Sequence, residues 1–296
     1  MKKLISLLLV LMLALSASMA LAATEPNSKT IEETTSYETE NLKITIDRWC
    51  YAFNRTECRF FVADIVVSDP AQLRTAFAGE KYTASAAEAT SEIAMRHDAA
   101  LAINGDYYNY KDDYGMIIRN GMLYRSAPST RDHLLVYTDG TFKGLFAADY
   151  IEGAGEQYVA DGVVQSFAFG PLLVMDGQAT VMPEKYIVST KDTIREPRTA
   201  IGMVDKNHYV IVVADGRRNG WSEKGMTLQE LQLVMQEAGC RVAFNLDGGA
   251  SAHFYWKDRI SNKPSGGGRE ISDIIYVAKE SYPASGIFCG KAGYSE

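Results

Sequence analysis

Residues 241–249 read RVAFNLDGG, an apolar run that ends at Asp247 and is followed by two glycines. Residues 99–106 (AALAINGD) and residues 209–217 (YVIVVADGR) repeat this design. Buried strands that end in acidic residues at a common edge can build a polar site, because glycine lets a backbone or a ligand approach where a Cβ would obstruct it. We therefore expect an enzyme whose carboxylates come from the ends of strands.

Strand-like segments outnumber helical ones in the rest of the chain. Asn120-Gly121 and Asp139-Gly140 each separate two β-like runs, which predicts antiparallel hairpins in the middle of the sequence. Residues 90–96 and 227–238 have helical patterns, and Gly239 ends the second. This combination predicts an α+β fold in which a large mixed, mainly antiparallel β-sheet is flanked by helices in a single catalytic domain.

The two ends of the chain are expected to lie outside that domain, which we place at residues 41–278. Residues 1–22 have a basic start, an apolar run and a small-x-small pattern, as in a cleaved export signal. Residues 23–40, rich in Thr, Ser and Glu, are predicted to be a flexible spacer, and residues 279–296 a tail. We expect a secreted, extracellular protein without stable membrane insertion after signal cleavage; an uncleaved anchor is the alternative.

The charge of the chain argues against a nucleic-acid partner. There are 30 basic and 37 acidic residues, for a formal net charge of −7, and no basic cluster. A mildly acidic surface mainly promotes solubility, so an anionic substrate would be held by a few placed arginines. The oligomeric state stays open.

Four cysteines in an exported chain predict disulfide bonds. Cys50 and Cys58 flank a polar segment between two β-like runs, so we favour their pairing across a hairpin, which leaves Cys240 with Cys289. The other two pairings stay open. A zinc site is disfavoured because no two cysteines have CxxC spacing.

Asp247 is the first candidate for the chemistry. An Asp-Gly turn alone would be unremarkable, but Asn245 and Ser251 place further polar groups around the same tight loop. A plain hairpin does not need them, so the loop predicts a functional site.

Asp215 is the second candidate, because it joins a carboxylate to the guanidinium of Arg217 at a strand end. A solvent-exposed ion pair is the alternative interpretation. The planar guanidinium of arginine binds phosphate through two parallel hydrogen bonds, and Arg198 begins another predicted strand. If these groups reach one pocket together with Asp106 and Asp247, we expect a site for phosphate and sugar.

Two further candidates have competing structural explanations. Thr227 and Glu230 form a capping-box pattern at a helix start, which by itself explains Glu230. Residues 104–108 (NGDYY) are either a turn with packed aromatic rings or a carboxylate beside rings that stack on sugar. His97 and His253 have no ligand spacing, and we expect surface or core positions for both.

Six segments in order resemble the phosphodiester glycosidase family, which includes the enzyme that removes N-acetylglucosamine from a phosphodiester on mannose. They are AINGDYY, RTAIGMV, VVADGR, GMTLQELQLVMQEAGC, AFNLDGGASA and GGGREISDIIYV. The resemblance implies a secreted hydrolase that cleaves the C1–O bond of a sugar-1-phosphodiester on cell-surface or environmental glycans.

The resemblance also assigns roles position by position. It implies catalytic roles for Asp247, Asp215 and Glu230. The substrate-binding candidates are Asn104, Gly105, Asp106, Arg198, Gly216, Arg217, Asn245, Gly248, Gly249 and Ser251. Asp106 stands where many relatives have glycine, and His253 where many have threonine, so the sugar and the leaving group stay open.

Two alternatives to a phosphodiester glycosidase are kept. The first is a metal-dependent phosphodiesterase that cleaves O–P and uses the aspartates to hold a hard cation such as Ca²⁺ or Mg²⁺. The second is a non-catalytic exopolysaccharide-binding protein. The glycosidase itself implies no cofactor.

Overall fold

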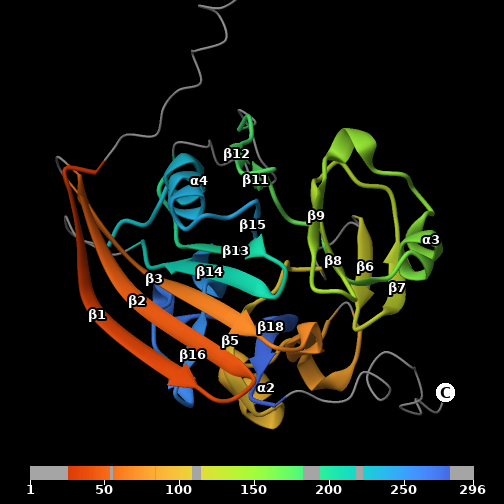
Figure 1. Ribbon diagram of the computed structural model, residues 1–296, viewed down its shortest axis with the longest axis horizontal. Helices are drawn as coiled ribbons and strands as arrows, with labels where there is room; N and C mark the ends of the chain where they lie inside the picture. The colour runs from red at the N-terminus through yellow and green to blue at the C-terminus, as the bar shows by residue number, and fades with distance from the viewer. Residues whose placement is uncertain are drawn as a thin grey trace, which may run out of the picture.

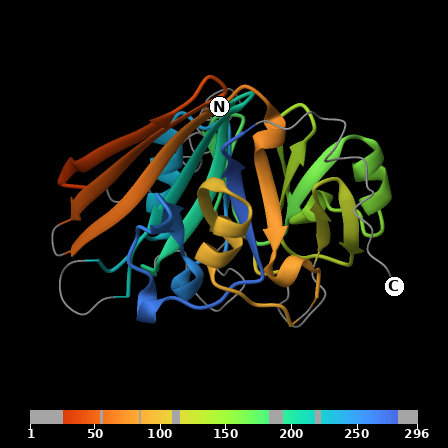
Figure 2. The same ribbon diagram turned by 90° about the horizontal axis from the view of Figure 1, so that it is seen from below.

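The computed structural model describes residues 26–53, 56–83, 85–108, 115–182, 194–217 and 223–280. The predicted signal and residues 281–296 of the predicted tail lie outside these ranges. The described chain forms two large antiparallel β-sheets that face each other, two smaller sheets and three helices (Figures 1 and 2). None of these helices has the length and apolar character needed to cross a membrane.

The largest sheet has eight strands. They are β1 (Ser28–Glu38), β2 (Leu42–Phe53), β3 (Thr56–Val67), β11 (Leu172–Met175), β12 (Gln178–Ala179), β13 (Arg198–Asp205), β14 (His208–Ala214) and β15 (Val242–Asn245). Their spatial order is β1-β2-β3-β14-β13-β15-β11-β12, and every neighbouring pair is antiparallel.

The second sheet has five strands in the order β17-β16-β5-β18-β4. They are β4 (Leu73–Phe77), β5 (Ala99–Asn104), β16 (Phe254–Trp256), β17 (Arg259–Ile260) and β18 (Asp273–Ala278). The smaller sheets contain β8 (His133–Tyr137), β9 (Phe142–Leu145) and β10 (Val163–Phe167) in one and β6 (Met116–Arg119) and β7 (Met122–Ser126) in the other. All strand pairings among the described residues are antiparallel. The predicted antiparallel character is therefore confirmed, and the expected mixed sheet is wrong for this part of the chain.

The main core lies between the two large sheets. Strand β14 shows how it is built, because Ile211 and Val213 face the second sheet whereas Val210 and Val212 face outward. The period of two along a strand sends alternate side chains to opposite faces. Both faces of β14 are covered, which explains why the strand is apolar at every position rather than at alternate ones.

Helices cover the outer faces. Helix α4 (Leu228–Glu237) packs on the outer face of the eight-stranded sheet, and α2 (Thr90–Arg96) on that of the five-stranded sheet. The third helix, α3 (Gly155–Ala160), packs beside β6, β7 and β10 (Figure 1). Both helices predicted from the sequence are confirmed.

Strand β1 replaces the predicted flexible spacer. Residues Ser28–Glu38 pair along their whole length with β2, although most of their side chains are exposed. The low apolar content suggested too little burial to repay ordering. However, a polar strand at a sheet edge is held by its ladder of backbone hydrogen bonds, and threonine favours a strand.

The register of β2 and β3 excludes the favoured disulfide. Tyr51 lies opposite Cys58, and Cys50 lies opposite Arg59, so the two cysteines are offset by one residue. Successive side chains point to opposite faces, and the two thiols therefore face away from each other. Cys50, Cys58 and Cys240 are free, and Cys289 lies outside the described residues.

Candidate functional site

Three neighbouring strands of the largest sheet, β13, β14 and β15, have ends that lie side by side at one end of the sheet. Strands β14 and β15 both pair with β13, so they run parallel to each other on its two sides. Arg198 lies opposite Ala214, and Ala200 opposite Asn245. The carboxyl ends of β14 and β15 therefore flank the amino end of β13, as the positions of the carboxylates predicted.

The five-stranded sheet brings β5 to the same edge. The side-chain nitrogen of Asn104, its last residue, donates a 2.7 Å hydrogen bond to the backbone oxygen of Asp247. The hydroxyl of Thr199 on β13 donates to the side-chain oxygen of Asn104 at 2.9 Å. Asn104 is buried, and it ties the two sheets together where the polar loops begin.

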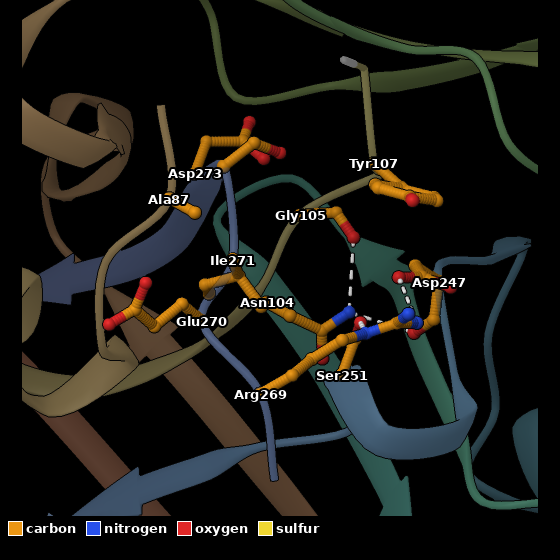
Figure 3. Close-up of a pocket in the computed structure, with 11 residues that line it drawn as sticks. Ala87, Asn104, Gly105, Tyr107, Asp247, Ser251, Arg269, Glu270, Ile271 and Asp273 are labelled. Carbon is orange, nitrogen blue, oxygen red and sulfur yellow. Dashed lines mark hydrogen bonds and ion pairs between the residues drawn. The ribbon is translucent and has the colours of Figure 1, made fainter. Parts of the chain in front are cut away.

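A cavity of about 200 Å³ opens at this junction (Figure 3). Its lining comes from the ends of β5 and β15 and from the segment before β18. The lining residues are Ala87, Asn104, Gly105, Tyr107, Asp247, Ser251, Arg269, Glu270, Ile271, Ser272 and Asp273. Of the residues predicted for the site, Asn104, Gly105, Asp247 and Ser251 are in this wall.

Asp247 faces Arg269 inside the cavity. Nη2 of Arg269 lies 3.4 Å from Oδ2 of Asp247, and Nε of Arg269 donates to the hydroxyl of Ser251 at 2.6 Å (Figure 3). The backbone amide of Gly248 donates to Oδ1 of Asp247 at 2.8 Å. Burial raises the pKa of Asp247, and the contacts with Ser251, Arg269 and Gly248 oppose that rise. The carboxylate is desolvated but oriented, as a general base or an electrostatic stabiliser must be.

Glycines let the Asp247 loop sit directly on another backbone. A Cβ at Gly248 would lie 2.4 Å from the backbone oxygen of Pro197, and the amide of Gly249 donates to that oxygen at 2.9 Å. A Cβ at Gly105 would lie 2.2 Å from Oδ1 of Asp273. These positions are glycine because backbone and carboxylate atoms occupy the space of a side chain.

Asp215 and Arg198 reach the same edge but do not line the cavity. Oδ1 of Asp215 accepts hydrogen bonds from the backbone amide of Lys263 at 2.8 Å and from Nδ2 of Asn262 at 3.2 Å. The guanidinium of Arg198 donates to the backbone oxygens of Met226 at 3.1 Å and Ile194 at 3.0 Å. Burial lowers the pKa of Arg198 to about 10. Both side chains hold neighbouring loops, so the expected shared pocket is not formed in the way predicted.

Glu230 and Arg217 also have local partners. Glu230 and Thr227 form the reciprocal capping box of α4, and Glu230 is ion-paired with Arg195. The structure therefore supplies the capping explanation for Glu230 and places it away from the cavity. Arg217 is half exposed and ion-paired with Glu196. Its guanidinium lies beside Gly249 in the Asp247 loop, where an added Cβ would be 3.1 Å from Nη1 and Nη2.

Two predicted binding residues are buried behind the cavity wall. Oδ1 of Asp106 accepts from Nη2 of Arg119 at 2.8 Å, and its Oδ2 accepts from the amide of Ala168 at 2.8 Å. Nδ2 of Asn245 donates to the backbone oxygen of Gly170 at 2.7 Å. Neither residue lines the cavity, and these contacts hold the backbone behind its wall.

The cavity wall also contains charged groups that were not predicted as site residues, among them Arg269 and Asp273, and it contains Tyr107, one of the rings for which sugar stacking was an alternative. The guanidinium carbon of Arg269 lies 5.4 Å from the ring centre of Tyr107. Arg269 and Asp273 precede or begin β18, and the amino end of an antiparallel strand lies beside the carboxyl end of its neighbour. The carboxyl ends of strands do not indicate them, whereas residues 266–273 (GGGREISD), within one of the segments that resemble the family, do.

The described residues contain no group of three or more His, Cys, Asp or Glu side chains placed to hold a metal ion. His253 is buried, its Nδ1 lies 2.6 Å from the hydroxyl of Thr90, and burial lowers its pKa to about 4. It is a core histidine, as its lack of ligand spacing suggested.

The amino-acid sequence is similar to a known family and to a protein of Bacillus subtilis. A family model described as phosphodiester glycosidase matches residues 97–278. A Bacillus subtilis (strain 168) protein described as "SPbeta prophage-derived uncharacterized protein YomE" is 27% identical over 203 residues. That match covers 66% of this chain and 30% of the relative, so the chain spans less than a third of the relative's length.

Two solved structures are similar in fold. The zebrafish N-acetylglucosamine-1-phosphodiester alpha-N-acetylglucosaminidase catalytic domain, auto-inhibited by its pro-peptide, has a TM-score of 0.65 and 18% identity over 87% of this chain and 90% of that one. A hypothetical protein from Synechocystis has a TM-score of 0.56 and 16% identity over 82% of this chain and 63% of that one. At these identities the likeness shows the fold.

Proposed function

Because the chain belongs to the phosphodiester glycosidase family, we propose that it hydrolyses a sugar-1-phosphodiester, of the N-acetylglucosamine-1-phosphodiester kind, between C1 of the sugar and the phosphate oxygen. The observation that carries the proposal is the buried carboxylate of Asp247 beside the guanidinium of Arg269 in one cavity. The substrate is a cell-surface or environmental glycan, and the protein is secreted, in line with the export pattern of residues 1–22.

Asp247 and Arg269 act on different parts of the substrate. The leaving phosphate is already acidic, so its protonation matters less than for an ordinary glycoside, and the main demand is on the sugar side. A water oxygen bonds to C1, and the C1–O bond breaks with its electron pair going to the phosphate. Asp247 takes the proton of that water and stabilises the positive charge that develops at C1.

Arg269 takes the phosphate-binding role that the sequence predicted for Arg198. The guanidinium of Arg198 is engaged by two backbone oxygens, whereas Arg269 lines the cavity and is almost half exposed. A guanidinium at this position neutralises charge on the departing phosphate monoester. Asn104 and Ser251, both in the wall, orient sugar hydroxyls or water.

The test is a screen of glycosyl-1-phosphodiesters in ¹⁸O-labelled water with analysis of both products. We expect a free sugar that carries the label at C1 and an unlabelled phosphate monoester. Label in the phosphate would instead establish O–P cleavage and a phosphodiesterase. Retention of a glycan without any product would establish a binding protein.

A further inference from the structure

Asp273, at the start of β18, is a carboxyl group of the cavity that the mechanism above does not use. Its side chain is 1% exposed, and Oδ2 accepts a hydrogen bond from Nε of Arg119 at 2.9 Å. Oδ1 has no hydrogen-bond partner among the described residues. This oxygen is itself buried; it lies against Gly105, and both residues belong to the wall of the cavity.

The charges around Asp273 do not balance. Asp106 and Asp273 share the single guanidinium of Arg119, and all three side chains are at most 2% exposed. Two buried carboxylates beside one cation leave an uncompensated negative charge, which is expensive away from water. A proton on one of the acids removes that charge.

Asp273 is the member of the pair placed to hold the proton. Burial raises its pKa to about 6; Asp106 adds to the rise, and contacts with Arg119 and Ser272 oppose it. Tyr108 faces it from the loop after β5, and burial keeps the Tyr108 phenol protonated. Both oxygens of Asp106 already accept hydrogen bonds, whereas Oδ1 of Asp273 accepts none. The remaining charged groups of the cavity are Asp247, Arg269 and Glu270.

We propose that Asp273 binds the phosphate of the substrate as a neutral acid, donating a hydrogen bond from Oδ1 to a phosphate oxygen. An ionised carboxylate at this position would repel a phosphodiester anion, whereas a carboxylic acid supplies a donor without adding charge. Asp273 is thus a substrate-binding residue, and the site accepts anionic esters only when the Asp273 carboxyl group is protonated. The inference rests on the proposed function for the identity of its ligand.

This role makes affinity depend on pH in a defined direction. Binding is constant below the pKa of Asp273 in the free protein and weakens about tenfold for each pH unit above it. A carboxylate that accepted a hydrogen bond from a sugar hydroxyl would give the opposite trend, with binding lost as pH falls.

The experiment measures binding by titration calorimetry between about pH 5 and pH 8. The probes are sulfate and the methyl diester of N-acetylglucosamine-1-phosphate, whose charges are constant over that range. The diester is titrated into Asp247→Asn, so that it is not cleaved, and into Asp247→Asn combined with Asp273→Asn. Asparagine keeps the size of Asp273 and a donor but has no proton to lose.

With Asp273 present, we expect the affinity for the diester to fall about 50-fold from pH 6 to pH 8, with proton uptake on binding. With Asp273→Asn the affinity is flat and about 100-fold higher at pH 8 than in the parent. An unchanged slope in Asp273→Asn, an equal loss of affinity at every pH, or no binding of either probe would overturn the inference.

Two further variants keep the test decisive if Asp273→Asn folds poorly. Asp106→Asn removes a charge that adds to the rise that burial causes in the Asp273 pKa, so the midpoint moves to lower pH; an unmoved midpoint contradicts the proposal. Asp98→Asn makes the same change of charge at an exposed residue whose φ of 46° asparagine tolerates, and it keeps the parent midpoint. Cleavage by the unmodified protein is measured separately, so the proposed function can fail while sulfate binding still tests Asp273.

Discussion

The loops that follow β14 and β15 begin alike and differ in what becomes of their carboxylates. Each places an Asp-Gly pair at the same edge of the largest sheet, on one side of β13. Asp247 faces Arg269 inside the cavity, whereas Asp215 accepts hydrogen bonds from Lys263 and Asn262. The end of a strand sets the position of its carboxylate. The chain segment that packs over that strand end determines whether the carboxylate is open to the cavity.

The largest expected effect is on turnover in Asp247→Asn. Loss of the base and of its negative charge should lower kcat/KM on a glycosyl-1-phosphodiester by about 10²–10⁴-fold. The fold should persist, because the side-chain oxygen of asparagine can still accept from Gly248. Steady-state kinetics with circular dichroism checks this. Undiminished turnover by folded protein would remove Asp247 from the chemistry and erase the contrast with Asp215.

Asp215→Ala should act on stability instead. Removing the carboxylate leaves the amide of Lys263 and the side chain of Asn262 without their buried acceptor. This should lower the free energy of unfolding by about 3 kcal/mol. Urea denaturation measures the loss. Asp215→Asn is the matched control, because its carbonyl oxygen can replace the main acceptor and should recover most of the stability. If Asp215→Asn folds normally yet loses turnover as severely as Asp247→Asn, the distinction between the loops is wrong.

The strand ends were predictable because they depend on local pattern, whereas the cavity depends on register and loop paths. The apolar run of β14 and the helical period of α2 appear in the structure with the expected bounds. Composition could not show that β1 is held by its neighbour, nor that β2 and β3 are offset so as to separate Cys50 from Cys58.

Part of the candidate site followed from the same local signals. Asn104 and Asp247 are at predicted strand ends and line the cavity. Asp215 and Arg198 have equally suggestive positions, and only the paths of residues 262–263 and of the segment around Met226 show that they are engaged. Arg269 was missed because no strand-end rule indicates the amino side of β18.

Gly248 and Gly216, which follow Asp247 and Asp215, differ in how closely they pack on Pro197. A Cβ at Gly248 would meet the backbone oxygen of Pro197 at 2.4 Å, and one at Gly216 would meet the nitrogen of the same residue at 2.8 Å. Gly248→Ala should therefore lower the unfolding free energy by about 2 kcal/mol and also reduce turnover, because Asp247 moves with the loop. Gly216→Ala should be milder and should leave kcat/KM per folded molecule closer to the parent. Thermal unfolding and kinetics of both variants would show equal behaviour if the loops were equivalent.

The smallest effect concerns the pH dependence of stability. Burial raises the pKa of Asp247 in the folded protein above that of the unfolded chain. Its contribution to stability is therefore fully present below the unfolded pKa and is lost as pH rises through the folded pKa. Asp247→Asn abolishes this loss, so the variant should gain stability relative to the parent between about pH 4 and pH 7. Urea unfolding at both pH values measures the difference, and a relative loss would mean that the carboxylate is favoured as an anion.

The central position of β18 in its sheet affects the order in which the strands can pair during folding. This strand is inserted between β4 and β5, so Asp273 and Ile274 pair with Phe77 and Asn104 from the first half of the chain. Strands β4 and β5 cannot join the same sheet until β18 docks between them, and such distant pairing forms slowly. Because Arg269 and Asp273 come with the same segment, the cavity is completed only when β18 has docked.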